Sequence, residues 1–347
     1  MKAAVLSPAK DLRIVDIEKP RPRLGEILIE VKVSTICPTD LRKYLGHTRI
    51  ISPLILGHEF SGVVAELGER VVNVELQDRV TVFPVYPCGK CRYCKKEQYN
   101  LCNKPSGIGG LIELGEKING SFAEYIVVRA ENVFKLPESL SFEEGALIEP
   151  LAAALRGVLQ SNVKPGDISL VMGAGPMGLL QVMLLKVAGA TKVIVSEPLP
   201  HRRNWAKEFG ADVVVDPYAE DLKEVVDSET EGYGVNEVLI STGGSVEADL
   251  VPQALELTSK SGTVVVFAGT WPLKLAEINP NLIHYGERRI VGSFLYTIED
   301  FQRALKLATS GKLKLSRIIT HRYTLEKIKE AFEVVISKKG LKVAILP

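Results

Sequence analysis

The chain has 347 residues, of which 46% are hydrophobic and 24% are charged, and its 43 basic residues against 42 acidic ones leave a net charge of +1. This balance argues against a basic nucleic-acid surface and an electrostatic membrane anchor. The sequence also lacks an apolar run of about 18 residues for a spanning helix and the apolar core of a signal peptide. We therefore expect two domains in the cytoplasm, with no nucleic-acid or membrane partner.

The first 150 residues consist of short apolar stretches separated by turn residues. Residues 25–33 alternate between apolar and polar side chains, as a half-buried strand does. Residues 61–67, 78–83 and 122–128 have the same character. Closely spaced strands of this kind predict a compact β-barrel-like domain.

Four cysteines lie close together in the same region, at Cys88, Cys91, Cys94 and Cys102. The first three are separated by two residues each, so that their thiolates converge from one tight loop. Four thiolates fill the tetrahedral shell of zinc and leave no open position. This spacing predicts a structural zinc lobe, and it favours a reducing compartment over a disulfide framework.

From about residue 152 onward, helical and strand patterns alternate. A helix begins there, and six apolar strands are expected at 168–172, 192–196, 213–215, 237–240, 263–267 and 289–294, with helices such as 177–188 and 201–209 between them. This alternation predicts a parallel sheet with helices on both faces. Helices at 298–310 and 325–337 and a strand at 341–346 follow, so the parallel-sheet domain is expected to be inserted into the first domain.

A glycine-rich turn joins the first of these strands to its helix, with Gly173, Gly175 and Gly178 in the Gly-x-Gly-x-x-Gly pattern. In this context the pattern predicts a dinucleotide site, because the turn and the helix amino terminus receive a pyrophosphate. Glu197 ends the second strand, where a carboxylate accepts the adenosine ribose hydroxyls and disfavours a 2′-phosphate. NAD is therefore expected rather than NADP, although Arg202 and Arg203 stand close enough in sequence to pair with such a phosphate.

A second set of metal-binding side chains precedes the cysteine lobe. Cys37 follows the strand at 25–33, and His58 and Glu59 stand in a Gly-His-Glu segment about twenty residues later. A thiolate, an imidazole and a carboxylate suit a catalytic zinc that keeps an open position. Glu149 is a further candidate, because a carboxylate within an apolar run is costly unless it is paired or bound to a metal.

The Gly57-His58-Glu59-x-x-Gly62 segment, the cysteine lobe and the glycine turn occur in an order that resembles zinc-dependent medium-chain alcohol dehydrogenases. Glu149-Pro150 is similar to the sorbitol and polyol dehydrogenase branch of that family. The resemblance covers essentially the whole chain. It implies an α/β fold with a GroES-like β-barrel catalytic domain (residues 1–151 and 297–347), an inserted Rossmann domain with a six-stranded parallel sheet (152–296), and a structural zinc lobe (86–105).

The resemblance also implies roles for individual residues. Cys37, His58 and either Glu59 or Glu149 would hold the catalytic zinc, and Thr39 would pass on the proton of the substrate hydroxyl. The family often has a histidine where this chain has Arg42, which cannot act as a base. The residues expected to contact the cofactor are Gly173, Gly175, Pro176, Met177, Gly178, Glu197, Arg202, Thr242, Ala268, Gly269, Phe294 and Leu295.

The resulting hypothesis is an NAD-dependent enzyme with two zinc ions per chain that oxidises a secondary alcohol or polyol to the ketone. A threonine 3-dehydrogenase-like or sugar-alcohol-phosphate dehydrogenase is the alternative within the same chemistry, since a basic run from Arg42 to Arg49 would suit an anionic substrate. A non-catalytic zinc-binding interaction protein is the alternative from another class. The resemblance suggests a homotetramer, or else a dimer formed by edge-to-edge joining of the nucleotide-domain sheets.

Overall fold

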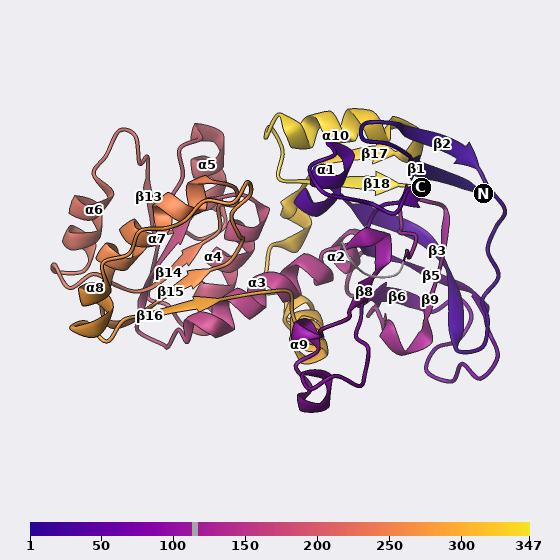
Figure 1. Cartoon of the computed structure of the whole chain (residues 1–347), viewed down its shortest axis with the longest axis horizontal. Coiled ribbons are helices and arrows are strands. Elements are labelled where there is room, and N and C mark those ends of the chain that lie inside the picture. Colours follow the sequence, from indigo (N-terminus) through magenta and orange to yellow (C-terminus); the bar gives the residue numbers. More distant parts are fainter. Residues whose placement is uncertain (113–116) are drawn as a thin grey trace. The chain divides into compact units, whose positions relative to one another are not determined.

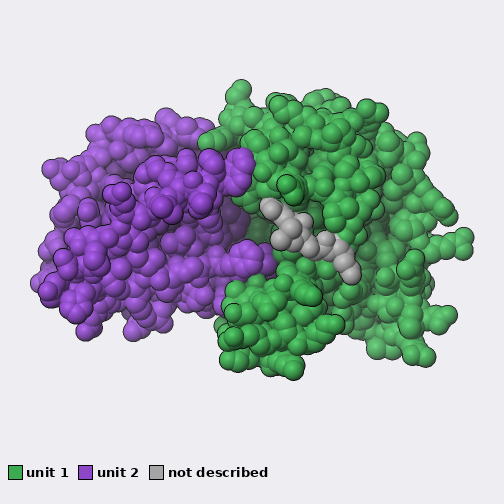
Figure 2. All heavy atoms as spheres, in the orientation of Figure 1, with its two compact units in different colours: residues 1–150, 297–311, 315–347 green, residues 151–296, 312–314 purple. Residues whose placement is uncertain are grey.

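The computed structural model describes residues 1–112 and 117–347, which divide into two compact units (Figure 2). Unit 1 comprises residues 1–150, 297–311 and 315–347, and unit 2 comprises residues 151–296 and 312–314. Among the described residues, none of the helices has the length and apolar character needed to cross a membrane.

Unit 1 is built mainly from antiparallel strands. One sheet has the order β2-β1-β4, and a larger one has the order β10-β6-β5-β3-β18-β17 with β9 also paired to β3. A small β7-β8 pair lies apart from both. The strands are β1 (Lys2–Leu6), β2 (Leu12–Asp16), β3 (Glu26–Thr35), β4 (Leu54–Ile55), β5 (Glu59–Leu67), β6 (Arg79–Val82), β7 (Val85–Tyr86), β8 (Ser106–Gly107), β9 (Tyr125–Arg129), β10 (Val133–Lys135), β17 (Ile319–Thr324) and β18 (Lys342–Leu346).

The ten-residue strand β3 organises this unit, because β5, β9 and β18 all pair with it. The carboxyl-terminal strand therefore lies in the same sheet as amino-terminal strands, as Figure 1 shows for β18 (yellow) and β3 (indigo). The helices that begin in or belong to unit 1 are α1 (Pro38–Tyr44), α2 (Phe142–Ala146), α3 (Ile148–Ser161), α9 (Ile298–Thr309) and α10 (Ile328–Ile336). Helix α3 continues into unit 2.

Unit 2 contains a six-stranded parallel sheet in the order β13-β12-β11-β14-β15-β16. Successive residues along β11 have side chains on opposite faces of the sheet, and both Leu170 and Val171 are buried. Both faces of the sheet are therefore covered. The elements are β11 (Ile168–Met172), α4 (Pro176–Ala188), β12 (Lys192–Ser196), α5 (Pro200–Glu208), β13 (Val213–Val215), α6 (Leu222–Glu229), β14 (Val235–Ile240), α7 (Val246–Leu257), β15 (Thr258–Val266), α8 (Pro280–His284) and β16 (Arg289–Gly292).

The expected elements are present, and several of their boundaries needed correction. Strand β15 begins at Thr258 rather than 263, because Thr258 pairs with Val235 across a register shift. The strand expected at 122–128 is only Tyr125–Arg129, since Phe122 instead bonds the backbone of Leu56 and Ala4. Strand β16 ends at Gly292 rather than 294, and helix α3 begins at Ile148 rather than near 152. Glu149 therefore lies in the first turn of a helix.

Candidate active site

Cys37, His58 and Glu59 come together in unit 1. Cys37 is the residue that caps the amino terminus of α1, whereas His58 directly precedes β5 and Glu59 begins it. One ligand atom from each of the three side chains lies within 4.8 Å of the other two. His58 and Glu59 are buried and Cys37 is half-buried. The geometry thus gathers a thiol, an imidazole and a carboxylate in one place.

Asp40, to which the sequence analysis assigned no role, fixes this arrangement. Its Oδ2 accepts a hydrogen bond from the Cys37 amide at 2.9 Å, and its Oδ1 accepts one from the Gly57 amide at 3.2 Å. The same Oδ1 lies 3.4 Å from His58 Nδ1. Burial by itself would lower the pKa of His58, but Asp40 and Cys37 outweigh that effect and raise it well above 6.5. The sequence signal was an acid three positions after the cysteine, the spacing of a capping box.

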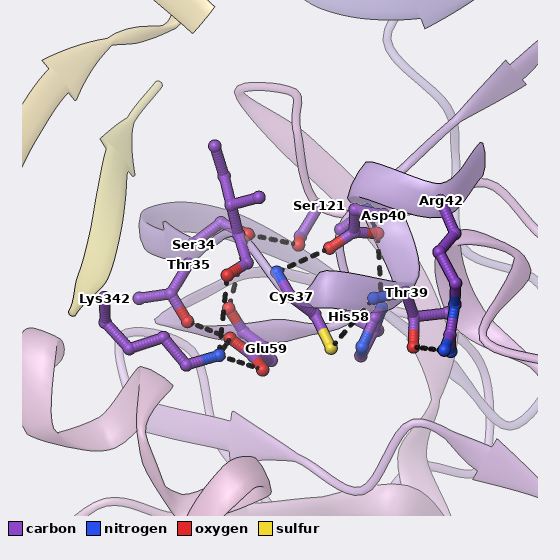
Figure 3. Close-up of polar contacts among 12 residues, drawn as sticks. Ser34, Thr35, Cys37, Thr39, Asp40, Arg42, His58, Glu59, Ser121 and Lys342 are labelled. Carbon is purple, nitrogen blue, oxygen red and sulfur yellow. Dashed lines mark hydrogen bonds and ion pairs between the residues drawn. The ribbon is translucent and has the colours of Figure 1, made fainter. Parts of the chain in front are cut away.

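Lys342 is the second residue that the sequence analysis missed. Glu59 lies opposite Thr35 in the β3–β5 register, and Thr35 lies opposite Ala344 in the β3–β18 register. This pairing places the Lys342 ammonium against both oxygens of Glu59, where the Thr35 hydroxyl also donates to Glu59 (Figure 3). Both members of the ion pair are almost fully buried, at 2% and 1% exposure.

The other acidic candidate, Glu149, is not one of the three residues whose ligand atoms cluster. It is buried in unit 1 and near enough to affect Lys342. Burial lowers the pKa of Lys342, but Glu59, Cys37 and Glu149 together raise it above 10.5. The lysine thus supplies positive charge amid three of the proposed zinc ligands.

Thr39 and Arg42 lie one turn apart on α1. Arg42 Nη2 donates to Thr39 Oγ1 at 3.3 Å, so the exposed guanidinium lies beside the hydroxyl (Figure 3). The Thr39 amide in turn faces Cys37 Sγ at 3.5 Å. One short helix and the residue that caps its amino terminus therefore carry a thiol, a hydroxyl and a permanent positive charge.

The four-cysteine segment also folds as a metal-binding group. The four sulfurs lie within 4.8 Å of one another, with 3.5 Å between the sulfurs of Cys91 and Cys94 and 4.0 Å between those of Cys88 and Cys94. Zinc–sulfur bonds of about 2.3 Å in a tetrahedron give sulfur–sulfur edges of about 3.8 Å. Cys102 Sγ accepts the amides of Cys88 and Lys104. Backbone amides, chiefly that of Asn103, lower the pKa of Cys91 to about 6, which favours the thiolate that a metal requires.

In unit 2 the glycine turn leads from β11 into α4. Gly173 has φ of +107°, and a side chain at Gly178 would collide with the Gly173 carbonyl at 1.9 Å. Around Gly175, by contrast, an added methyl group would approach only Arg202, at 3.6 Å. Pro176 and Met177 begin α4, whose amino terminus has no side-chain cap. The turn therefore offers open space and uncapped amides of the kind that bind phosphate.

Glu197 and Arg202 lie beside this turn. The Glu197 carboxylate is buried and accepts the amides of Ala174 at 2.7 Å and Leu199 at 3.0 Å. Arg202 Nε is buried without a hydrogen-bond partner among the described residues. Burial lowers the pKa of Arg202, while Glu197 opposes that shift. The arginine is thus placed beside the glycine turn with an unused donor.

The other expected cofactor residues follow the carboxyl ends of β14, β15 and β16. The Thr242 hydroxyl donates to the Met172 carbonyl at 3.0 Å and lies against Gly173. Ala268 and Gly269 are exposed, Phe294 is 60% exposed and Leu295 has a positive φ of 50°. These positions all lie at the carboxyl ends of the parallel strands, where dinucleotides bind in such folds.

Comparison with known proteins agrees with this geometry. Residues 23–138 match the alcohol dehydrogenase GroES-like domain family, and residues 176–310 match the zinc-binding dehydrogenase family. The chain is 38% identical to L-threonine 3-dehydrogenase of Pyrococcus furiosus over 98% of this chain and 96% of that protein. The chain belongs to the zinc-dependent medium-chain alcohol dehydrogenase family. This membership confirms the predicted resemblance and fold class.

Two solved structures of the dehydrogenase family extend the comparison. 2R,3R-butanediol dehydrogenase of Bacillus subtilis superposes with a TM-score of 0.89 at 36% identity, covering 100% of this chain and 99% of that one. A zinc-binding dehydrogenase of Sinorhizobium meliloti bound to NADP gives 0.92 at 32% identity, again covering 100% and 99%. The present dehydrogenase is therefore an oxidoreductase acting on CH–OH groups, with zinc and a nicotinamide cofactor.

Proposed function

We propose that this dehydrogenase transfers hydride from a secondary alcohol or polyol to NAD and gives the ketone. The observation that carries the proposal is the cluster of Cys37, His58 and Glu59, whose ligand atoms all lie within 4.8 Å of one another. A binding module would need neither this donor set nor a glycine turn in a parallel sheet. Two zinc ions per chain are expected, one in this cluster and one among the four cysteines.

The cluster fits a catalytic zinc. Neither ring nitrogen of buried His58 makes a hydrogen bond within the described residues, and Nδ1 faces Asp40, which leaves Nε2 for a metal. Glu59 is the third ligand that the clustering favours, and Glu149 remains the alternative. Bound zinc supplies a Lewis acid that lowers the pKa of a coordinated hydroxyl group.

The proton of the substrate hydroxyl would leave through Thr39. Its Oγ1 accepts from Arg42, which leaves one further acceptor site and its own O–H donor. Because Arg42 stays protonated, it cannot receive the proton from Thr39, so solvent takes it directly. We therefore expect the pH profile of kcat/KM to show no ionisation of a relay histidine.

The cofactor is proposed to be NAD. Glu197, buried at the end of β12, would repel a 2′-phosphate and accept ribose hydroxyls. The counter-argument is Arg202, whose Nε has no hydrogen-bond partner in the described part of the chain, and one solved relative is bound to NADP. Steady-state kinetics with both cofactors decides between them: a kcat/KM that favours NADP would contradict the assignment.

A second candidate substrate class is anionic, and Arg42 favours it. No acidic partner pairs with its exposed guanidinium in residues 1–112 and 117–347, although it lies beside Thr39. A guanidinium binds carboxylate or phosphate in a bidentate manner. The similarity to an L-threonine 3-dehydrogenase, whose named substrate carries a carboxylate, supports the same class.

Metal analysis and a substrate panel test these proposals together. About two zinc ions per chain support the enzyme, whereas about one supports a structural zinc protein. Neutral polyols, 2,3-butanediol, threonine and polyol phosphates are then compared with NAD by NADH absorbance. If the substrate is anionic, Arg42→Ala should raise its KM about tenfold while leaving neutral alcohols unchanged. Arg49→Ala, at an exposed arginine of the same basic run, is the matched control.

The proposed assembly is a homotetramer, or a dimer formed through β16. This strand is one of the two edges of the parallel sheet, and large exposed side chains flank it at Tyr285 (75%) and Phe294 (60%). An edge strand is a template for strand pairing with another copy. A monomer in sedimentation equilibrium would contradict this assembly.

A further inference from the structure

Glu247 is a buried carboxylate in unit 2 that the reaction described above does not use. It lies in the first turn of α7 and is fully buried. Its Oε1 accepts the amide of Ala268 at 3.2 Å, and its Oε2 accepts the amide of Gly269 at 2.5 Å. The amino terminus of α7 also favours negative charge there. One carboxylate thus holds two successive amides of the segment that follows β15.

This contact determines where the carbonyl groups of the segment point. The peptides that join residues 267 to 269 are trans, so each carbonyl is directed opposite to its own amide. With the amides of Ala268 and Gly269 turned toward Glu247, the carbonyls of Phe267 and Ala268 are turned away from it. Gly269 has φ of +135°, a conformation that glycine adopts readily, so the hydrogen bonds to Glu247 fix one of several backbone conformations open to this segment.

We propose that Glu247 is a positioning residue for the cofactor: it orients the 267–269 segment so that its carbonyls accept the carboxamide NH₂ of the nicotinamide. The inference rests on the proposed function, in which NAD is the cofactor, and on the expectation that Ala268 and Gly269 contact it. The carboxamide offers two N–H donors, and outward-facing backbone carbonyls are matching acceptors. Glu247 acts through the backbone and does not touch the cofactor itself.

Glu247→Gln tests this role with little change in side-chain shape. The glutamine oxygen can accept one of the two amides, but its NH₂ group would oppose the other. Isothermal titration calorimetry of the full chain compares NADH with ADP-ribose, which has the same phosphates and adenosine but no nicotinamide. We expect the Kd for NADH to rise about tenfold, as the loss of one charge-assisted hydrogen bond predicts, and the Kd for ADP-ribose to stay unchanged.

Asp249→Asn is the matched control, because it removes the same charge from the same helix. Asp249 is exposed and pairs with Lys274 at 2.6 Å, so both ligands should bind this variant as they bind the wild type. If Glu247→Gln does not fold, Glu247→Asp keeps the charge and should show the same selective loss on a smaller scale.

Three outcomes would overturn the inference. Unchanged NADH binding in Glu247→Gln would show that the segment does not need Glu247. Equal weakening of NADH and ADP-ribose would make Glu247 a general folding residue. A wild-type chain that binds neither ligand would overturn the proposed function, and this inference with it.

Discussion

Removing the Lys342 ammonium should lower the free energy of unfolding of the metal-free dehydrogenase more than removing one charge from a surface ion pair would. Lys342 is 2% exposed and Glu59 1% exposed, and Lys342→Met would leave the Glu59 carboxylate buried, with the Thr35 hydroxyl as its remaining polar contact among the residues that the structure describes. Breaking a buried pair by deleting one partner typically costs about 3–5 kcal/mol, because the other charge stays uncompensated. Methionine keeps most of the side-chain volume, so the loss of stability would reflect the missing charge rather than poorer packing.

Calorimetric unfolding of metal-free protein measures this effect. Lys2→Met is the matched control: Lys2 pairs with Glu326 at 2.7 Å, but the two side chains are 47% and 52% exposed, and such pairs contribute only about 0–1 kcal/mol. Adding Glu59→Gln to Lys342→Met should recover much of the loss, since the buried charge is then gone. Zinc should also recover part of it by supplying the missing positive charge. A loss no larger than that of Lys2→Met would refute the reasoning.

Two further predictions concern the metal cluster and the parallel sheet. Cys37→Ala should abolish turnover while leaving the calorimetric Kd for NADH nearly intact, and equal loss of both would make Cys37 a folding residue. Burial and then Asp167 raise the pKa of Glu237 to about 8, against an ordinary 4.5. Because the folded-state pKa is the higher one, the contribution of Glu237 to stability is fully present below pH 4.5 and is lost, by up to roughly 5 kcal/mol, as the pH rises to about 8. Glu237→Gln should flatten this slope of Tm against pH between 5 and 8, and an unchanged slope would contradict the assigned pKa.

The sequence by itself determined the features that depend on neighbouring residues. The strands at 168–172, 192–196 and 213–215 were predicted to the residue because apolar runs between turns define buried parallel strands. The glycine turn could be recognised because Gly173 and Gly178 satisfy steric demands within a few residues of each other. The cysteine spacing likewise predicted four converging sulfurs, and the structure places them within 4.8 Å of one another.

Tertiary structure alone decided which distant side chains meet. Lys342 pairs with a carboxylate 283 residues earlier, because β18 adds to β3 in one register. Asp40 holds the Gly57 amide, and Glu247 holds the amides that follow β15, through contacts between separate elements. Local periodicity predicts which face of a strand or helix is buried, but not which strand will be its neighbour. The donor set could therefore be predicted from sequence, whereas the charged and hydrogen-bonded partners that hold it in place could be identified only in the folded chain.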